Sequence, residues 1–475
     1  MLLFLQITFN ASYTNPPPFT LHPTETVYIA ANIIDGKLIN GSWGGSLLDL
    51  IDAIGKERVF VSIYGGPTAA LKEFASKLEC ESSIVSEEEE PIPLDKIPHT
   101  KLPTGESRIK RIAYLAEVRN KALEPLEQQA NKGKIYDRVL FINDIYFTPT
   151  DALRLLWGTN VSPSGTSEYK AVCAADFVTS WKYYDTYGTR DSEGYSIGVP
   201  IFPWFANEGD AESRRDVLAG KDAVRVKSCW GGMVAFDGRY FVSGDETGSK
   251  PEKLTRDAVG PPTLPLRFRS EPDPFWDASE CCLIHADIMA LPSFPSSSSI
   301  SAQSIQDSTS SKDEGIYMNP YVRVTYDSSS QSRIWIVKRF ERLFALPQAI
   351  INIFAHMPRF NYRRTEKEGE IVKDKVWVSN INPESPTSSN FKDGTFATSA
   401  EKISGGVKFK RATLGGDKLK GKDYWKAQGY YKDVERVAER GGYCGVRQLL
   451  VLKENRGEGE GNWDNLLDLM PPLNV

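Results

Sequence analysis

The chain has 475 residues, of which 40% are hydrophobic and 25% are charged, and its formal net charge is −5. This composition is that of an ordinary globular protein, long enough for two domains or for one large α/β domain with appendages. The slightly acidic balance gives no reason to expect nucleic acid as a partner. Six cysteines without C-x-x-C spacing argue against a zinc site, and their even number permits disulfides without requiring them.

The first residues are apolar, but the run is short. Met1–Phe9 (MLLFLQITF) is too short to span a bilayer and has neither a basic flank nor a cleavage site. We expect residues 1–23 to hold either the remnant of a longer signal anchor or a plain edge strand. Three N-x-S/T sequons, at Asn10, Asn40 and Asn160, favour a secretory compartment only weakly.

Strands and helices alternate in the next part of the chain. Thr26–Asn32 and Arg58–Tyr64 are apolar runs of strand length, and Ser46–Ile54 and Thr68–Leu78 have the pattern of helices. This β-α-β-α rhythm predicts a parallel, Rossmann-like sheet. No G-x-G-x-x-G follows the first strand, so the dinucleotide-binding fingerprint is absent.

A long helix is predicted over Ser107–Gln129, and its apolar stripe is interrupted. The helical period calls for an apolar residue at 119 or 120, where the sequence has Arg119-Asn120. An inward-facing charge usually has a partner. A structural ion pair, with Glu117 or an acid at a strand end, and a bound nucleotide phosphate explain the interruption equally well.

The central strand ends in a carboxylate. Val139–Ile142 is a short apolar run followed at once by Asn143-Asp144, and Thr148-Pro149 with Asp151 then opens a helix through Trp157. Ligands bind at the carboxyl edge of open α/β sheets, and an Asp there suits a hard cation that bridges phosphates. The alternative is that Asn143-Asp144 only turns the chain, since both residues favour turns.

Another buried strand, Tyr169–Val178, ends near Asp176 and leads into a long aromatic loop, Ser180–Gly194. Loops of this length and variety tend to be functional. Trp181 and the tyrosines of the loop suit stacking on sugar rings. Three charged side chains either hold sugar hydroxyls or fix the loop itself: Asp185, Arg190 and Asp191.

Val224–Phe241 has the pattern of two strands joined by Trp230-Gly231-Gly232. The glycine pair permits close approach of a ligand, or it marks a bulge. Further on, Arg267–Leu291 contains His285, one of only four histidines. Histidine is a common metal ligand, but a lone histidine is more often a hydrogen-bonded core residue.

The remaining chain divides into four parts. Residues 292–314 are a Ser-rich insertion, and Met318–Tyr326 resumes a strand that closes a domain over residues 24–330. Residues 331–360 form an apolar helical extension with basic side chains, which either packs on the domain or lies on a membrane face. From about Tyr362 to residue 475 the chain is charged and Gly-rich, and we expect much of it to be poorly ordered.

Several of these segments, taken in order, carry a family resemblance. VYIAANIIDGK, RIAYLAEVRNKALEPL, DRVLFINDIYF, CAADF, WKYYDTYGTRD, KSCWGGMVAFD and FRSEPDPFWDASECCLIHADI resemble the fungal capsule-associated (cryptococcal-type) α-1,3-mannosyltransferase family between Thr24 and Tyr326. The resemblance implies a GT-A type glycosyltransferase with one Rossmann-like, mostly parallel sheet flanked by helices. It further implies GDP-mannose as donor, Mn²⁺ or Mg²⁺, and a type II anchor in the Golgi membrane, which this sequence does not show.

The resemblance also implies roles for the donor side of the site. Asn143-Asp144 occupies the place of the Asp-x-Asp signature, so Asp144 is the expected metal ligand, although the first acid of that signature is missing. His285 is the candidate for the later histidine that completes such metal sites. Arg119-Asn120 resembles the Arg-Asn pair with which related enzymes hold the donor.

On the acceptor side, the resemblance implies that Trp230, Gly231 and Gly232 line the site, and that Glu280 is the carboxylate near the anomeric carbon. Transfer from GDP-α-mannose to an α-linked product means retention, with Glu280 or Asp176 stabilising an oxocarbenium-like centre or acting as a transient nucleophile. The expected function is therefore a retaining mannosyltransferase acting on a glycan. Two alternatives are a transferase with another donor, such as UDP-xylose, and an inactive glycan-binding or assembly protein.

Overall fold

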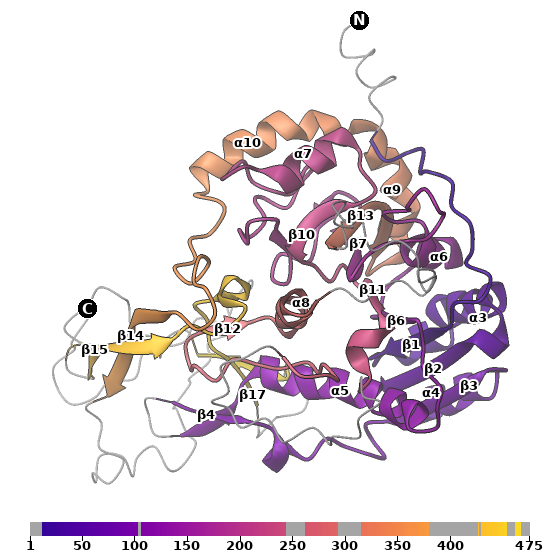
Figure 1. Ribbon diagram of the computed structural model, residues 1–475, viewed down its shortest axis with the longest axis horizontal. Coiled ribbons are helices and arrows are strands. Elements are labelled where there is room, and N and C mark those ends of the chain that lie inside the picture. Colours follow the sequence, from indigo (N-terminus) through magenta and orange to yellow (C-terminus); the bar gives the residue numbers. More distant parts are fainter. Residues whose placement is uncertain are drawn as a thin grey trace, which may run out of the picture.

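The computed structural model describes residues 12–102, 106–243, 262–292, 315–379, 426, 429–453 and 461–466. One ten-stranded sheet dominates it, with the order β3-β2-β1-β6-β11-β7-β13-β10-β9 and with β8 beside β7 (Figure 1). The strands of this sheet are β1 (Val27–Ala31), β2 (Val59–Gly65), β3 (Glu81–Ser86), β6 (Arg138–Ile142), β7 (Ala171–Thr179), β8 (Lys182–Tyr183), β9 (Arg190–Asp191), β10 (Val224–Ser228), β11 (Met233–Asp237) and β13 (Ile316–Thr325).

The sheet is parallel on one side and mixed on the other. β3, β2, β1 and β6 are parallel neighbours, and β13 runs parallel to β7. β11 lies antiparallel between β6 and β7, and β10 is antiparallel to both β13 and β9. The predicted α/β class, a Rossmann-like sheet flanked by helices, is confirmed.

Helices cover both faces of the sheet because the central strands are apolar on both. In β6, Val139 and Phe141 point into one core and Leu140 and Ile142 into the other. The first core also contains α5 (Arg111–Ala130) and α8 (Glu280–Ala290). The second contains α3 (Ser42–Ile54), α4 (Thr68–Ala75) and α6 (Pro149–Trp157), and α2 (Gly36–Ile39) lies at its edge.

The helix start predicted after the central strand is confirmed in detail. The Thr148 side chain accepts a hydrogen bond from Asp151 N, the Asp151 side chain accepts one from Thr148 N, and Pro149 is the first helical residue. The long helix begins later than expected, because Ser107–Ile109 forms strand β5 against β4 (His99–Lys101).

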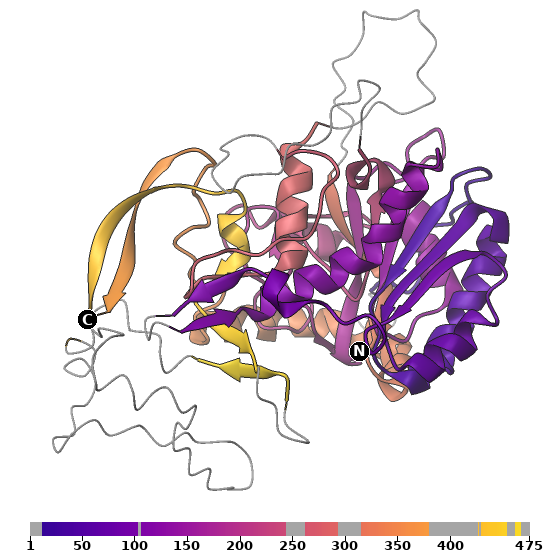
Figure 2. The same ribbon diagram turned by 90° about the horizontal axis from the view of Figure 1, so that it is seen from below.

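The described parts of the C-terminal region form strands rather than irregular chain. β14 (Ile371–Ser379) and β15 (Gly429–Val437) make a two-stranded antiparallel sheet that stands away from the main sheet (Figure 2). β16 (Gly445–Val446) pairs with β12 (Asp277–Ala278), and β17 (Leu450–Leu452) pairs with β18 (Trp463–Asn465). The helical extension consists of α9 (Ser328–Phe340), the 3₁₀ turn η5 (Glu341–Phe344) and α10 (Ala345–Phe354). Beneath α10 lies the helix α7 (Glu212–Ala219) (Figure 1).

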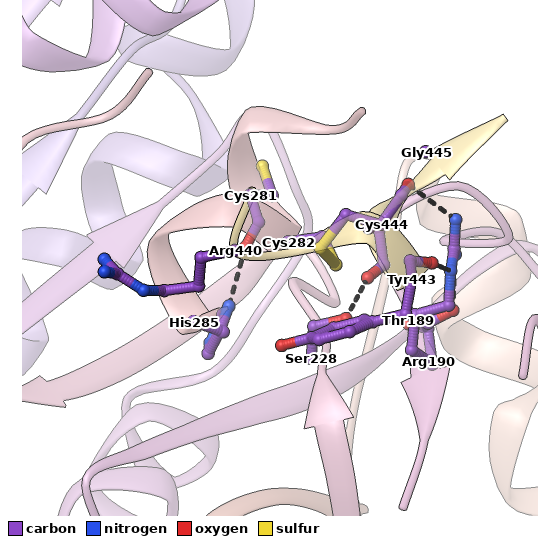
Figure 3. Close-up of a disulfide and its surroundings, with 12 residues drawn as sticks. Thr189, Arg190, Ser228, Cys281, Cys282, His285, Arg440, Tyr443, Cys444 and Gly445 are labelled. Atoms are coloured by element: carbon purple, nitrogen blue, oxygen red, sulfur yellow. Dashed lines mark hydrogen bonds between the residues drawn. A yellow bond between two sulfur atoms is a disulfide. The ribbon is translucent and has the colours of Figure 1, made fainter. Parts of the chain in front are cut away.

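Two disulfides tie distant parts of the chain together. Cys173 on β7 is bonded to Cys229, which follows β10. Cys282 on α8 is bonded to Cys444, which fastens the C-terminal region to the domain (Figure 3). Arg190 strengthens the same junction, because its guanidinium donates to the carbonyl oxygens of Tyr443 and Cys444.

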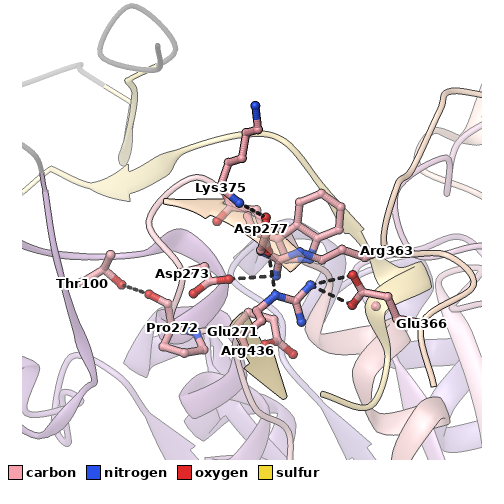
Figure 4. Close-up of polar contacts among 12 residues, drawn as sticks. Thr100, Glu271, Pro272, Asp273, Asp277, Arg363, Glu366, Lys375 and Arg436 are labelled. Carbon is pink, nitrogen blue, oxygen red and sulfur yellow. Dashed lines mark hydrogen bonds and ion pairs between the residues drawn. The ribbon is translucent and has the colours of Figure 1, made fainter. Parts of the chain in front are cut away.

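A network of ion pairs joins the β14–β15 sheet to the chain before α8 (Figure 4). Arg363 lies 2.8 Å from Asp273 and 2.9 Å from Asp374 of β14. Arg436 of β15 binds Asp374 and Glu366. The C-terminal region is thus held by a covalent bond and by paired charges, although it has little apolar core of its own.

Candidate functional site

The site is built at the carboxyl edge of the sheet, where β6 ends. Asn143 is fixed there from both sides: Trp43 Nε1 donates to its backbone oxygen at 2.9 Å, and Trp230 Nε1 donates to Oδ1 at 3.2 Å. The backbone N–H of Asn143 also donates to Gly232 O. These three hydrogen bonds hold Asn143 in place at the edge of the sheet. The next side chain, Asp144, is partly exposed.

Asp144 lies in a negatively biased environment. Burial and the nearby Asp35 carboxylate raise the pKa of Asp144, and Arg119 opposes them. Asp35 caps α2 in the segment that follows β1, so the chain after each of two neighbouring parallel strands supplies an acid. In the described part of the chain no salt bridge neutralises the Asp144 carboxylate. A cation at this edge would relieve that unfavourable charge.

The donor set nevertheless limits what cation the edge can hold. Among the described residues, no three His, Cys, Asp or Glu side chains are grouped as a metal cage. Mg²⁺ and similar ions are commonly bound by one or two carboxylates together with substrate phosphates. Asp144 therefore fits a metal that arrives with a diphosphate, and it does not fit a permanently bound structural ion.

Arg119 and Glu280, which the sequence singled out separately, lie together. Arg119 Nε donates to Glu280 Oε1 at 3.0 Å, and the guanidinium lies 4.1 Å from the centre of the Trp230 ring. The ion pair expected for Arg119 is confirmed, with Glu280 as its partner instead of Glu117. Only Nε has a hydrogen-bond partner among the described residues, so the guanidinium retains donors for a ligand.

Asn120 has a different environment from its neighbour. Its Nδ2 donates to Phe268 O at 2.9 Å, and its Oδ1 accepts from Phe268 N at 2.9 Å. Both ends of the amide are occupied by one backbone segment. Asn120 therefore holds the Phe268 segment against α5, and its role in binding the donor stays a prediction.

Asp176 is buried near the carboxyl end of β7. Tyr326 donates its hydroxyl hydrogen to Oδ2 at 2.8 Å, and Asp185 N donates to Oδ1 at 3.0 Å. Burial, followed by repulsion from the Asp185 carboxylate, raises the pKa of Asp176 to about 8. Asp176 therefore carries a proton at neutral pH, which makes it a poor nucleophile in the state described here.

Asp185 holds the turn that carries Trp230. Its carboxylate accepts hydrogen bonds from Trp230 N at 2.9 Å, Thr189 Oγ1 at 2.8 Å and Gly188 N at 2.8 Å. Gly231 follows at φ +59°, where a Cβ atom would lie 1.8 Å from Ala174 O. A glycine is therefore required here because the turn passes close to β7, which agrees with a bulge and not with approach of a ligand. Gly232 contacts the edge through its carbonyl oxygen, which accepts from Asn143 N.

The other charged residues of the aromatic loop are structural. Arg190 is 1% exposed and its guanidinium donates to four backbone carbonyl groups. Asp191 is 3% exposed and accepts from the N–H groups of Glu193 and Tyr195. The prediction that these two hold sugar hydroxyls is wrong, because they fix the loop. Trp181, 48% exposed, is free to meet a sugar ring.

His285 lies too deep in the fold to share a metal with Asp144. Its ring is fully buried, packs 5.4 Å from Phe236 and donates through Nδ1 to Cys281 O (Figure 3). Phe236 is opposite Val139 in the sheet, three residues before the end of β6 and so about 10 Å below the edge. Burial lowers the pKa of His285 to about 4. The metal role predicted for His285 is wrong, and the core-histidine alternative holds.

Two contributors to the site were not predicted: Asp35 and Tyr326. Tyr326 is the last residue of a predicted strand and Asp35 lies shortly after another, so the position at a strand end that identified Asp144 was the available signal. An open groove of about 730 Å³ lies beside Asp35, with Lys37, Pro67 and Glu73 in its wall. The ends of β1 and β2 thus leave space next to the acidic edge.

Comparison with protein families decides the class. The family model described as cryptococcal mannosyltransferase 1 matches residues 26–287, more than half of the chain. The chain belongs to this family. It is therefore a glycosyltransferase of the mannosyltransferase type, as the sequence motifs predicted, and the matched span contains Arg119, Asp144, Asp176 and Glu280. The parallel half of the sheet agrees with the GT-A type fold expected for the family.

Solved structures give weaker likenesses. Glucosyl-3-phosphoglycerate synthase from Mycobacterium tuberculosis, in complex with Mn²⁺, uridine diphosphate and phosphoglyceric acid, is 13% identical, with 76% of this chain and 89% of that one covered and a TM-score of 0.30. A mannosyltransferase from Pyrobaculum calidifontis, in complex with GDP-mannose and Mn²⁺, is 11% identical, with 74% and 73% covered and a TM-score of 0.31. Scores this low transfer neither a residue role nor a ligand. No curated protein matches the chain.

Proposed function

We propose that the protein is a retaining α-1,3-mannosyltransferase that moves mannose from GDP-mannose to a glycan with the help of Mn²⁺ or Mg²⁺. The observation that carries this proposal is the arrangement at one edge of the sheet: the unneutralised Asp144 carboxylate and the Arg119–Glu280 pair, with Trp230 in contact with both Asn143 and Arg119. Membership of a mannosyltransferase family supports the same chemistry.

The donor is assigned to the groove beside Asp35 and to the acidic edge. In this arrangement the nucleotide lies over the ends of β1 and β2, and its diphosphate reaches Asp144 and Arg119. A divalent cation held by Asp144 and the diphosphate would supply positive charge to the leaving group. The unused N–H groups of Arg119 donate to phosphate oxygens, where negative charge increases most as the glycosidic bond breaks.

Of the two candidate carboxylates, Glu280 is the better choice next to the anomeric carbon. Asp176 is protonated at neutral pH and is engaged by Tyr326 and the Asp185 backbone. Glu280 forms an ion pair with the residue assigned to the diphosphate. The bond from C1 of mannose to the diphosphate breaks, GDP leaves, and the acceptor oxygen bonds C1 on the same face while its proton passes to a phosphate oxygen.

The acceptor is assigned to the side of the edge formed by the Trp230 turn and the aromatic loop. Trp181 and Tyr184 are 48% and 52% exposed and offer rings for sugar stacking. We propose a location in the Golgi lumen, which two disulfides support, because such bonds form in oxidising compartments. In the described part of the chain, none of the helices is both long and apolar enough to cross a bilayer.

Calorimetric titration with GDP-mannose, with and without Mn²⁺, tests the proposal. We expect metal-dependent binding that Asp144→Asn weakens at least about tenfold, since the substitution removes the charge that holds the cation. Asp52→Asn is the matched control, because this acid is exposed on α3 away from the edge. Metal-independent binding insensitive to Asp144→Asn would contradict the assignment, and preference for UDP-xylose would change the donor.

A glycan-binding protein without activity is the second candidate, and Asn143 is the observation that favours it. The amide stands where the first acid of an Asp-x-Asp signature is expected, and Trp230 occupies its oxygen. Glycan binding that persists without any nucleotide-sugar binding is the outcome that this alternative requires.

A further inference from the structure

The helical extension exposes an unusually apolar surface. α9, η5 and α10 lie along one border of the molecule, with α10 over α7 (Figure 1). Large side chains here are mostly in solvent: Trp335 is 59% exposed, Leu346 71%, Ile350 46%, Ile353 73%, Phe354 81% and Phe360 91%. Contiguous exposure of this kind marks an interaction surface in soluble proteins.

The orientation of α10 shows that this exposure does not come from incomplete core packing. Gln348 is fully buried, accepts from Arg214 Nη1 at 2.6 Å and donates to Trp204 O at 3.1 Å. One turn later, Asn352 accepts from Val199 N at 2.7 Å. The helix therefore turns its polar side chains towards the protein and its apolar side chains outwards, the reverse of an ordinary surface helix.

The exposed charges on this surface have one sign. Residues 328–360 contain five basic side chains and the single acid Glu341. Arg333, Arg339 and Arg359 are exposed, whereas Lys338 lies against the protein and donates to Tyr321 O. Glu341 is 2% exposed and is bound at 2.7 Å by the buried Arg323. The surface is thus apolar and basic on a chain whose net charge is −5.

We infer that α9, η5 and α10 dock on the surface of a bilayer that contains anionic lipids. Apolar side chains of an amphipathic helix insert at the boundary of headgroups and acyl chains, while Lys and Arg bind lipid phosphates and carboxylates. Trp335, with Arg339 5.5 Å from its ring, suits the headgroup level. A symmetric dimer through the same face would place the basic side chains against one another, which opposes a second copy as occupant.

Ser12, the first described residue, donates its backbone N–H to Lys338 O, which ties the chain before β1 to α9.

Cosedimentation of the full chain with vesicles tests the inference. We expect binding to phosphatidylcholine vesicles that contain phosphatidylserine, and weaker binding to phosphatidylcholine alone. Ile353→Asp is expected to reduce binding at least about tenfold, because it places a charge in the inserted face. Arg339→Gln is expected to reduce binding only to the anionic vesicles.

The matched control is Ile135→Asp, the same change at a side chain that is 61% exposed in the loop between α5 and β6. It should bind vesicles as the unmodified chain does. Vesicle binding that is absent, or that Ile353→Asp leaves unchanged, would overturn the inference. So would a dimer in sedimentation velocity that Ile353→Asp dissociates, because the face would then be covered by a second copy.

Discussion

The proton on Asp176 makes the stability of the protein depend on pH. The folded protein holds the pKa of this carboxyl at about 8, whereas its ordinary value is 3.8. At a pH between these two pKa values, Asp176 keeps its proton in the folded state and releases it in the unfolded chain. The contribution is therefore fully present below the ordinary value and is lost as pH rises towards 8, at about 1.4 kcal/mol per pH unit.

Asp176→Asn isolates this contribution, since an amide resembles the protonated acid and cannot ionise. From about pH 5 to about pH 7, two pH units, the unmodified protein should lose about 3 kcal/mol of unfolding free energy through this group alone. The Asp176→Asn variant should not lose this free energy, because its amide does not ionise. The difference between variant and unmodified protein should therefore move by about 3 kcal/mol in favour of the variant.

Urea unfolding followed by tryptophan fluorescence at several pH values measures the difference. Asp52→Asn, at a side chain that is 63% exposed, supplies the baseline for removing one carboxylate. A difference between Asp176→Asn and the unmodified protein that stays constant with pH would refute the reasoning. It would mean that the buried carboxyl is ionised and that Tyr326 and the Asp185 amide satisfy its charge.

Three further predictions concern packing around the site. Glu280→Gln should cost about 3–5 kcal/mol in urea unfolding, because it leaves the guanidinium of Arg119 unpaired in a nearly buried position. Gly231→Ala should lower the melting temperature and cost more than about 1 kcal/mol, since a Cβ would meet Ala174 O and the residue is at φ +59°. Gly133→Ala is the control for backbone strain alone, because Gly133 is also at positive φ (+80°) but has open space around it. Cys444→Ser should cost about 5 kcal/mol by the loop-entropy relation for a separation of 162 residues, and unchanged stability would show that the ion-pair network alone holds the C-terminal region.

The parallel half of the fold was predictable because its signals are local. The strand at Val139–Ile142 is a continuous apolar run, as expected for a strand buried on both faces, and the Thr148 capping box is complete within four residues. Asp144 followed from the same reasoning, since the end of a central parallel strand is where ligands bind.

The partners within the site were not predictable, because they are distant in sequence. The interrupted stripe showed that Arg119 faces inwards, but its partner Glu280 lies 161 residues away. The helical period that indicated an inward-facing Arg119 does not indicate the partner of Asn120, whose amide bonds a backbone segment 148 residues away.

The environment of His285 and the strands of the described C-terminal residues were not predictable, for opposite reasons. α8 is buried on nearly all sides, so no apolar stripe indicates which of its polar residues face a ligand. β15 is largely exposed on both faces, so it lacks the alternation of a half-buried strand and reads as irregular chain.

Transfer itself tests the central claim most directly. The measurement is mannose transferred from GDP-mannose to a panel of mannoside acceptors with Mn²⁺, detected by mass spectrometry, for the unmodified chain and for Asp144→Asn with Asp52→Asn as control. We predict a product with an α-linkage, formed by the unmodified chain and the control and reduced at least about a hundredfold by Asp144→Asn. Transfer that Asp144→Asn leaves unchanged would contradict the placement of the reaction at the end of β6.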